Sequence, residues 1–223
     1  MNPTLNTSPK WKRILCLIFL FFYCTGIQTP INFSILDLIY GLVMFTLVFL
    51  MIPELFREAK KFKRKLLNLI WIPIGLIMLV LFQEIVCGYI IDFVTTKAGI
   101  DLNDANANNY VEMMKQNPVF FSCMGCIYGP ILEELLYRYT FFGMVYSKNR
   151  VLAYILPAMM FGLQHVIEAA VWNGDTVQFL NIPSYITAGL IFEFLYSKTK
   201  NLWIPIGAHI LFNSIGLYYM MTH

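Results

Sequence analysis

Long apolar segments separated by short polar loops run through most of this chain. Seven of them approach the roughly 20 residues that an α-helix needs to cross a bilayer. They cover residues 14–28, 34–53, 67–92, 118–146, 150–171, 178–197 and 202–221. This pattern predicts an all-α, polytopic bundle of about seven transmembrane helices, and therefore a multi-pass protein of the cell membrane.

Basic residues are concentrated in alternate loops. The segment before the first span and the loops after the second, fourth and sixth spans hold thirteen of the sixteen Lys and Arg residues. Because basic loops remain in the cytoplasm, the pattern predicts a cytoplasmic N-terminus and an external C-terminus. The Asn-rich loop 97–117 is then external. We expect it to form a short surface helix that covers part of the polar site within the spans described below.

The composition fits a membrane protein. Hydrophobic residues make up 58% of the 223 positions and charged residues 13%, whereas a soluble domain carries about 25% charge. We expect the lipid bilayer as a partner, and no nucleic acid. The five cysteines lie in or beside apolar runs, which favours free thiols. Cys123 and Cys126 have a CxxC spacing, but packing explains them better than metal or redox chemistry.

The fourth span contains three ionisable residues, Glu133, Glu134 and Arg138. A charged side chain inside a bilayer is costly unless it is paired or faces a wet cavity. On a helix Glu134 and Arg138 are i,i+4 neighbours and can form an ion pair. Glu133 points about 100° away from Glu134 and is free for another role.

Three further polar residues lie at a similar depth in later spans. At about 1.5 Å per residue, Glu133 and His165 lie roughly 20 and 22 Å from the cytoplasmic ends of their spans, and His209 and Asn213 roughly 12 and 18 Å. One shared site is the simplest explanation for polar residues at overlapping depths in three spans. Glu133 and the two histidines could hold a divalent metal such as zinc, with a water in the open position. Alternatively, Glu133 and His165 activate water without metal, and His209 and Asn213 stabilise an oxyanion.

The motifs Glu-Glu-x-x-x-Arg (133–138), Phe-x-x-x-His (161–165) and His-x-x-x-Asn (209–213) occur in this order on successive apolar spans. Together they resemble the CPBP family (CAAX protease and bacteriocin-processing, or Abi) of intramembrane proteases, which includes the type II CAAX prenyl endopeptidases. The resemblance covers about 118–221. It implies a catalytic four-helix core at 118–223, preceded by three spans and a loop at 1–117, and a cavity that opens toward the cytoplasm.

The resemblance also implies roles for single residues. Glu133 and His165 correspond to the pair that activates the attacking water, and His209 and Asn213 to the oxyanion stabilisers. Glu134 and Arg138 correspond to a supporting pair, which is equally well explained as a purely structural ion pair or as a substrate-positioning one. Phe161 is a further supporting position, and packing explains it best. Asn213 also has a structural alternative, because an amide can hold two helices together.

The leading hypothesis is thus an intramembrane endopeptidase that is glutamate- or metal-dependent, with a peptide or membrane-protein substrate. The chain lacks the His-Glu-x-x-His zinc motif, so both forms stay open. The alternatives are a non-catalytic immunity or scaffold protein and, with less support, an ion-coupled carrier, since buried carboxylates and histidines also mark ion paths. The compact, Lys- and Asn-rich chain is more typical of a bacterial plasma membrane.

Overall fold

The computed structural model describes residues 8–26, 34–64 and 66–222, and every regular element in these residues is a helix. The prediction of an all-α bundle is therefore confirmed. The end of the predicted first span, residues 27 and 28, lies outside the described residues.

The N-terminal part contains two separate helices, one long composite helix and a short transverse one. In chain order the elements are α1 (Lys10–Thr25), α2 (Ser34–Ala59), η1 (Lys60–Arg64), η2 (Leu66–Ile70), α3 (Trp71–Met78), η3 (Leu79–Cys87), α4 (Gly88–Ala98) and α5 (Ala105–Gln116). Asp104 caps α5 by accepting a hydrogen bond from the Ala107 amide at 3.1 Å, which satisfies a donor that the helix start leaves open. The helix predicted within the loop 97–117 is confirmed.

The C-terminal part contains one interrupted helix and three more that follow it. The elements are α6 (Pro118–Cys123), η4 (Met124–Tyr128), α7 (Gly129–Glu133), η5 (Glu134–Phe142), α8 (Gly143–Tyr146), α9 (Arg150–Ile167), η6 (Glu168–Trp172), η7 (Thr176–Asn181), α10 (Ile182–Thr199) and α11 (Trp203–Thr222). The segments η4, η5 and η6 are π-helical. Such widened turns occur frequently at functional sites.

Five helices in the described residues are long and apolar enough to cross a membrane. They are Ile39–Phe62, Leu66–Ala98, Pro118–Tyr146, Arg150–Trp172 and Thr176–Thr199. They match the second to the sixth predicted spans, and the third is longer than the predicted 67–92. The first and last predicted spans are helical, as α1 and α11, but do not meet the same standard of length and hydropathy. The count of seven thus stays a prediction.

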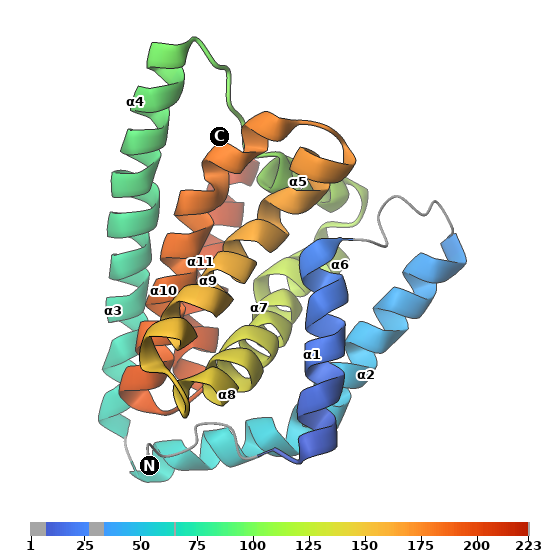
Figure 1. Ribbon diagram of the computed structural model, residues 1–223, viewed down its shortest axis with the longest axis vertical. Coiled ribbons are helices and arrows are strands. Elements are labelled where there is room, and N and C mark those ends of the chain that lie inside the picture. Colours follow the sequence, from blue (N-terminus) through green and yellow to red (C-terminus); the bar gives the residue numbers. More distant parts are fainter. Residues whose placement is uncertain (1–7, 27–33, 65, 223) are drawn as a thin grey trace.

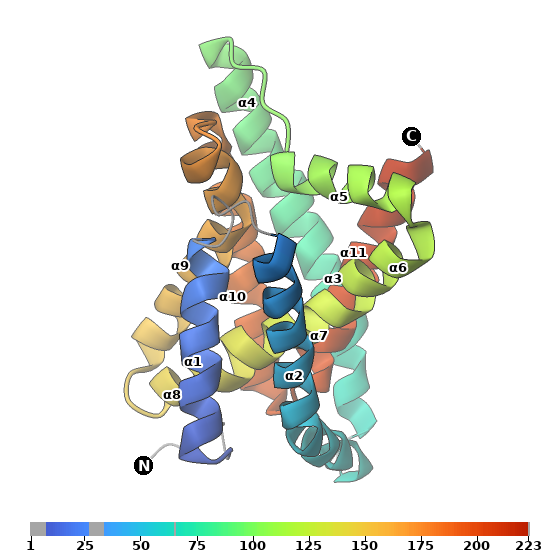
Figure 2. The same cartoon turned by 90° about the vertical axis from the view of Figure 1, so that its right-hand side faces the viewer.

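The long helices run side by side along the bundle, whereas α5 lies across one end of it (Figures 1 and 2). Helices α9 and α10 approach each other closely, since a Cβ added to Gly189 would lie 3.0 Å from the Ala158 Cα. Small residues at such points let membrane helices pack closely. Helix α1 contacts both α9 and η5, so helices from either side of residue 117 share one bundle. All five cysteines are free thiols, as predicted.

Candidate active site

The two adjacent glutamates occupy different environments. Helix α7 ends at Glu133, and the π-helical segment η5 begins at Glu134. The Glu134 side chain is fully buried, whereas the Glu133 side chain keeps 10% of its surface exposed. The prediction that the two carboxylates point in different directions is thus consistent with the structure, and only Glu133 is placed to meet a small molecule.

Glu134 joins Arg138 to His209. Its Oε1 accepts a hydrogen bond from Arg138 Nη1 at 3.2 Å and lies 3.0 Å from His209 Nδ1. Arg138 also donates from Nη2 to the Gly189 carbonyl oxygen at 3.1 Å, and its guanidinium stacks on the Phe161 ring at 4.4 Å. The predicted Glu134–Arg138 pair therefore forms, fully buried, and it additionally holds a histidine that the sequence pattern did not connect to it.

His209 lies between the two glutamates and is almost fully buried, with 4% of its surface exposed. Since a carboxylate only accepts, the 3.0 Å contact identifies Nδ1 as the protonated nitrogen that donates to Glu134. The opposite nitrogen, Nε2, points toward Glu133 and lies 3.7 Å from its Oε2. This distance is too long for a direct hydrogen bond. The imidazole stacks on Phe192 at 4.5 Å, which fixes its plane.

His165 also contacts the Phe161 ring. The ring centroids of His165 and His209 are 4.5 and 6.1 Å from that of Phe161. His165 Nδ1 donates to the Phe161 carbonyl oxygen at 2.7 Å, so Nε2 carries the free lone pair. Tyr185 stacks on the imidazole at 4.2 Å. Phe161 thus acts as the predicted packing wall, and it contacts two imidazoles whose Nδ1 atoms are both held by hydrogen bonds.

Asn213 is tied to the backbone of a neighbouring helix. It lies one turn beyond His209 on α11, and its Nδ2 donates to the Gly125 carbonyl oxygen at 3.0 Å, in the π-helical segment η4. Among the described residues it makes no hydrogen bond to Glu133 or His165. This hydrogen bond matches the structural alternative for Asn213, in which its amide holds two helices together.

Tyr23 is a site residue that the sequence did not reveal. Its hydroxyl donates to Glu133 Oε1 at 2.9 Å, although the two residues are 110 positions apart. Tyr23 comes from α1, outside the region that carries the three motifs. A tyrosine in an apolar span is ordinary, so no sequence signal distinguished it. In the structure it supplies the hydrogen bond that fixes one oxygen of Glu133.

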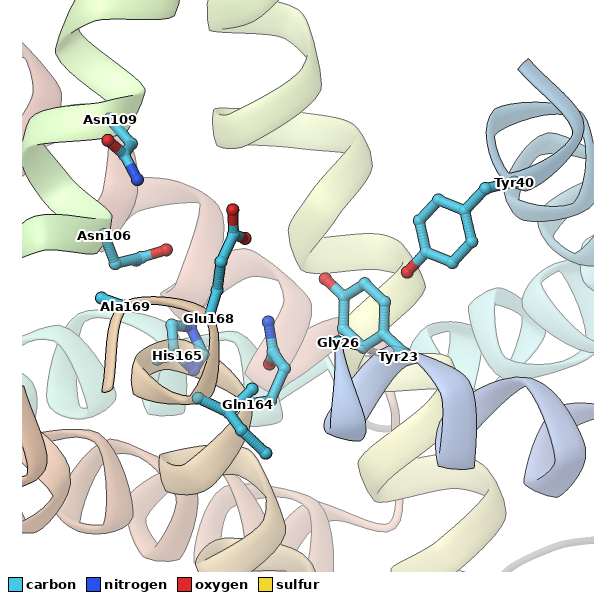
Figure 3. A pocket seen from close by; sticks show the side chains of 10 residues that line it. Tyr23, Gly26, Tyr40, Asn106, Asn109, Gln164, His165, Glu168 and Ala169 are labelled. Atoms are coloured by element: carbon cyan, nitrogen blue, oxygen red, sulfur yellow. The ribbon is translucent and has the colours of Figure 1, made fainter. Parts of the chain in front are cut away.

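A cavity of about 220 Å³ lies next to Tyr23 and His165. Its lining is mostly polar and comes from α1, α2, α5 and the end of α9 (Figure 3). Figure 3 shows the hydroxyls of Tyr23 and Tyr40 on one side and the amides of Asn106 and Asn109 on the other. The Glu168 carboxylate projects between them. Helix α5 therefore covers part of the site, as the sequence predicted.

The position of this cavity sets two of the expectations from the sequence against each other. The resemblance implied an opening toward the cytoplasm, but part of the lining comes from α5, which lies at the end of the bundle away from α8 and the basic loop that follows it (Figure 1). The basic loops are the ones that the charge pattern assigns to the cytoplasm. In this structure, the two expectations cannot both hold.

The candidate metal ligands do not converge. In the described part of the chain, no three side chains of the His, Cys, Asp and Glu types come together in a way that could hold a metal ion. The predicted set of Glu133, His165 and His209 includes one close pair, Glu133 and His209, and no hydrogen bond or ion pair links the described His165 to either. This arrangement does not fit a metal site.

Known proteins resemble this chain over the region of the three motifs. Residues 115–215 match the sequence profile of the family described as type II CAAX prenyl endopeptidase Rce1-like. YdiL of Bacillus subtilis (strain 168), named a candidate membrane peptidase, is 28% identical over 207 residues, which cover 89% of this chain and 78% of YdiL. No solved structure matches the chain significantly.

Two further relatives match smaller shares of the chain. The membrane-embedded CAAX protease MroQ of Staphylococcus aureus (strain USA300) is 27% identical over 170 residues, 74% of this chain and 63% of MroQ. The UPF0177 protein YvdC of Lactococcus lactis subsp. lactis (strain IL1403) is 25% identical over 116 residues, 51% of this chain and 40% of YvdC. The chain thus spans less than two thirds of both proteins.

Proposed function

We propose that this chain is an endopeptidase that uses Glu133 to activate water. It is a multi-pass bacterial membrane protein and belongs to the CPBP family of CAAX-type membrane proteases. One observation carries the proposal. The Glu133 carboxylate lies between the Tyr23 hydroxyl at 2.9 Å and His209 Nε2 at 3.7 Å. Tyr23 in turn lines the polar cavity together with His165. A partly exposed carboxylate in an otherwise dry wall is the feature that general base catalysis requires.

Glu133 is the proposed base. Tyr23 donates to its Oε1, which leaves Oε2 to accept a proton from a water in the cavity. The resulting hydroxide attacks the carbonyl carbon of the scissile peptide bond. The same proton then passes to the leaving amine, either directly from Glu133 or through the free Nε2 of His165. The peptide C–N bond breaks, one water is consumed, and Glu133 returns to its carboxylate form.

His209 is the proposed oxyanion stabiliser. Its Nδ1 donates to Glu134, so it can donate from Nε2 only as an imidazolium, which is a donor at both nitrogens. Two carboxylates, Glu134 and Glu133, flank the ring. Arg138 holds Glu134 from the other side at 3.2 Å and so orients the imidazole. Asn213 is the proposed second donor, a role for which it must exchange its bond to the Gly125 carbonyl oxygen.

The test is the loss of cleavage in two single variants, Glu133→Gln and His165→Ala. We expect a fall of about 10² to 10⁴-fold in processing, the usual contribution of a general base. The matched control is Glu112→Gln, which removes a carboxylate that is 67% exposed on α5. Proteomics of membrane fractions should show a precursor that accumulates in the two site variants and not in the control, at equal membrane levels of all three proteins.

Undiminished processing in both site variants would contradict the proposal. It would favour the non-catalytic immunity or scaffold alternative, because such a role needs binding surfaces and no general base.

A further inference from the structure

The bundle has one basic end, at which several chain segments meet. Lys12 at the start of α1 pairs with Glu54 of α2 at 3.0 Å. Lys61 of η1 donates to the Lys200 carbonyl oxygen, between α10 and α11, at 2.8 Å. Lys200 in turn donates to the hydroxyl of Tyr146, at the end of α8, at 3.5 Å. These contacts place the basic loops predicted to be cytoplasmic at a single end.

The opposite end is formed by other segments. The Trp172 indole, at the end of η6, donates to the Thr25 carbonyl oxygen at the end of α1, at 2.9 Å. The Ala105 amide at the start of α5 donates to Gln178 of η7 at 3.1 Å. Figure 2 shows α5 lying across this end. The loops here are acidic rather than basic, since two lysines stand against five carboxylates: Lys97, Lys115, Asp101, Asp104, Glu112, Glu168 and Asp175.

The cavity belongs to this acidic end. His165 lies seven residues before Trp172 and fifteen after Arg150, which places it about 10 Å from the acidic end and about 22 Å from the basic end at 1.5 Å per residue. Other lining residues lie even closer to the acidic end, such as Gly26 after the last turn of α1 and Asn106 on α5. No lining residue of this cavity comes from the basic loops.

We propose that the active site is entered from the outer face of the membrane and that its substrates are peptide segments presented on that face. That the entering peptides are substrates rests on the proposed function. The position of the entrance is independent of that function. Because the basic end of the bundle is retained in the cytoplasm, the acidic end and the cavity must face outward. An exported peptide, or the external end of a membrane-anchored one, reaches Glu133 without crossing the bilayer.

The cavity lining agrees with a polypeptide rather than a lipidated substrate. Hydroxyls, amides and a carboxylate can satisfy the backbone groups of an extended peptide, which carries a donor and an acceptor at nearly every residue. An isoprenoid chain would require an apolar groove instead. A prenylated CAAX tail is in addition the modified C-terminus of a cytosolic protein, and it would arrive at the wrong end of the bundle.

Sided cysteine labelling tests the position of the entrance. Asn109→Cys places a thiol in the cavity lining, and Lys148→Cys places one in a basic loop; both residues are exposed. The background carries Cys87→Ser and Cys123→Ser, because the other three cysteines are buried. A membrane-impermeant maleimide should label Asn109→Cys in intact cells, and Lys148→Cys only after permeabilisation. The unmodified background should remain unlabelled in both conditions.

Two results would overturn the proposal: Asn109→Cys that requires permeabilisation, or Lys148→Cys that does not. A bulky impermeant maleimide on Asn109→Cys should also lower precursor processing by intact cells at least tenfold relative to the same cells before treatment. Processing that continues at the earlier rate on fully labelled protein would equally refute an outer entrance. If no processing occurs before treatment, the proposed function fails, while the labelling pattern still decides the entrance.

Discussion

Replacing Arg138 by methionine should destabilise the protein more than any single change at its surface. The guanidinium and the Glu134 carboxylate are both fully buried, 3.2 Å apart. Arg138 also donates to the Gly189 carbonyl oxygen and stacks on Phe161. Removing one partner of a buried ion pair leaves the other charge uncompensated and costs about 3–5 kcal/mol. For a chain of this length, that corresponds to a melting temperature lower by about 6–20 °C.

The assay is thermal unfolding of the purified protein in one detergent, with Arg150→Met as the matched control, since Arg150 is exposed at the start of α9. A second variant identifies the cause. If the uncompensated carboxylate carries the cost, Arg138→Met combined with Glu134→Gln should melt higher than Arg138→Met alone, because the buried charge is gone. A melting temperature for Arg138→Met within about 2 °C of that of the control would refute the reasoning.

Three further predictions concern the site and its frame. Tyr23→Phe removes a hydrogen bond to a carboxylate, worth about 1.5–3 kcal/mol, so the rate of precursor cleavage by Glu133 should fall tenfold or more while the melting temperature changes little; an unchanged rate would exclude Tyr23 from the site. Gly189→Ala should melt lower than Gly216→Ala, because its Cβ would press on the α9 backbone whereas the Cβ at Gly216 meets nothing within 4 Å; equal melting temperatures would show that α9 and α10 can separate freely. Treatment with 1,10-phenanthroline should leave cleavage intact, and a loss that zinc restores would replace the metal-free mechanism by a metal-dependent one.

Features that depend on neighbouring positions or on composition could be predicted from the sequence. The spans follow from runs of apolar residues, because a bilayer admits only segments whose backbone groups are satisfied internally. The Glu134–Arg138 pair follows from its i,i+4 spacing, and the helix at 105–116 was expected within the loop 97–117. The buried site could be predicted too. Placing Glu133, His165 and His209 in a bilayer costs free energy unless they share one polar site.

The tertiary structure alone decided how these groups meet. His209 bonds Glu134 across 75 positions, and Tyr23 reaches Glu133 across 110. Neither contact leaves a periodicity in the sequence, since it depends on which helices become neighbours and how each is rotated about its axis. The π-helical segment that begins at Glu134 also changes the directions of the side chains that follow it, which the residue spacing does not predict.

The sequence by itself therefore determined that a polar, protease-like site lies within a helical membrane bundle. The packing determined the rest, in particular that α1 and α5, both outside the motif region, complete the cavity at the acidic end. The physical reason is the range of the forces involved. Hydropathy and helix-neighbour pairing act within a single segment, whereas the convergence of side chains from five elements is fixed only when their surfaces pack together.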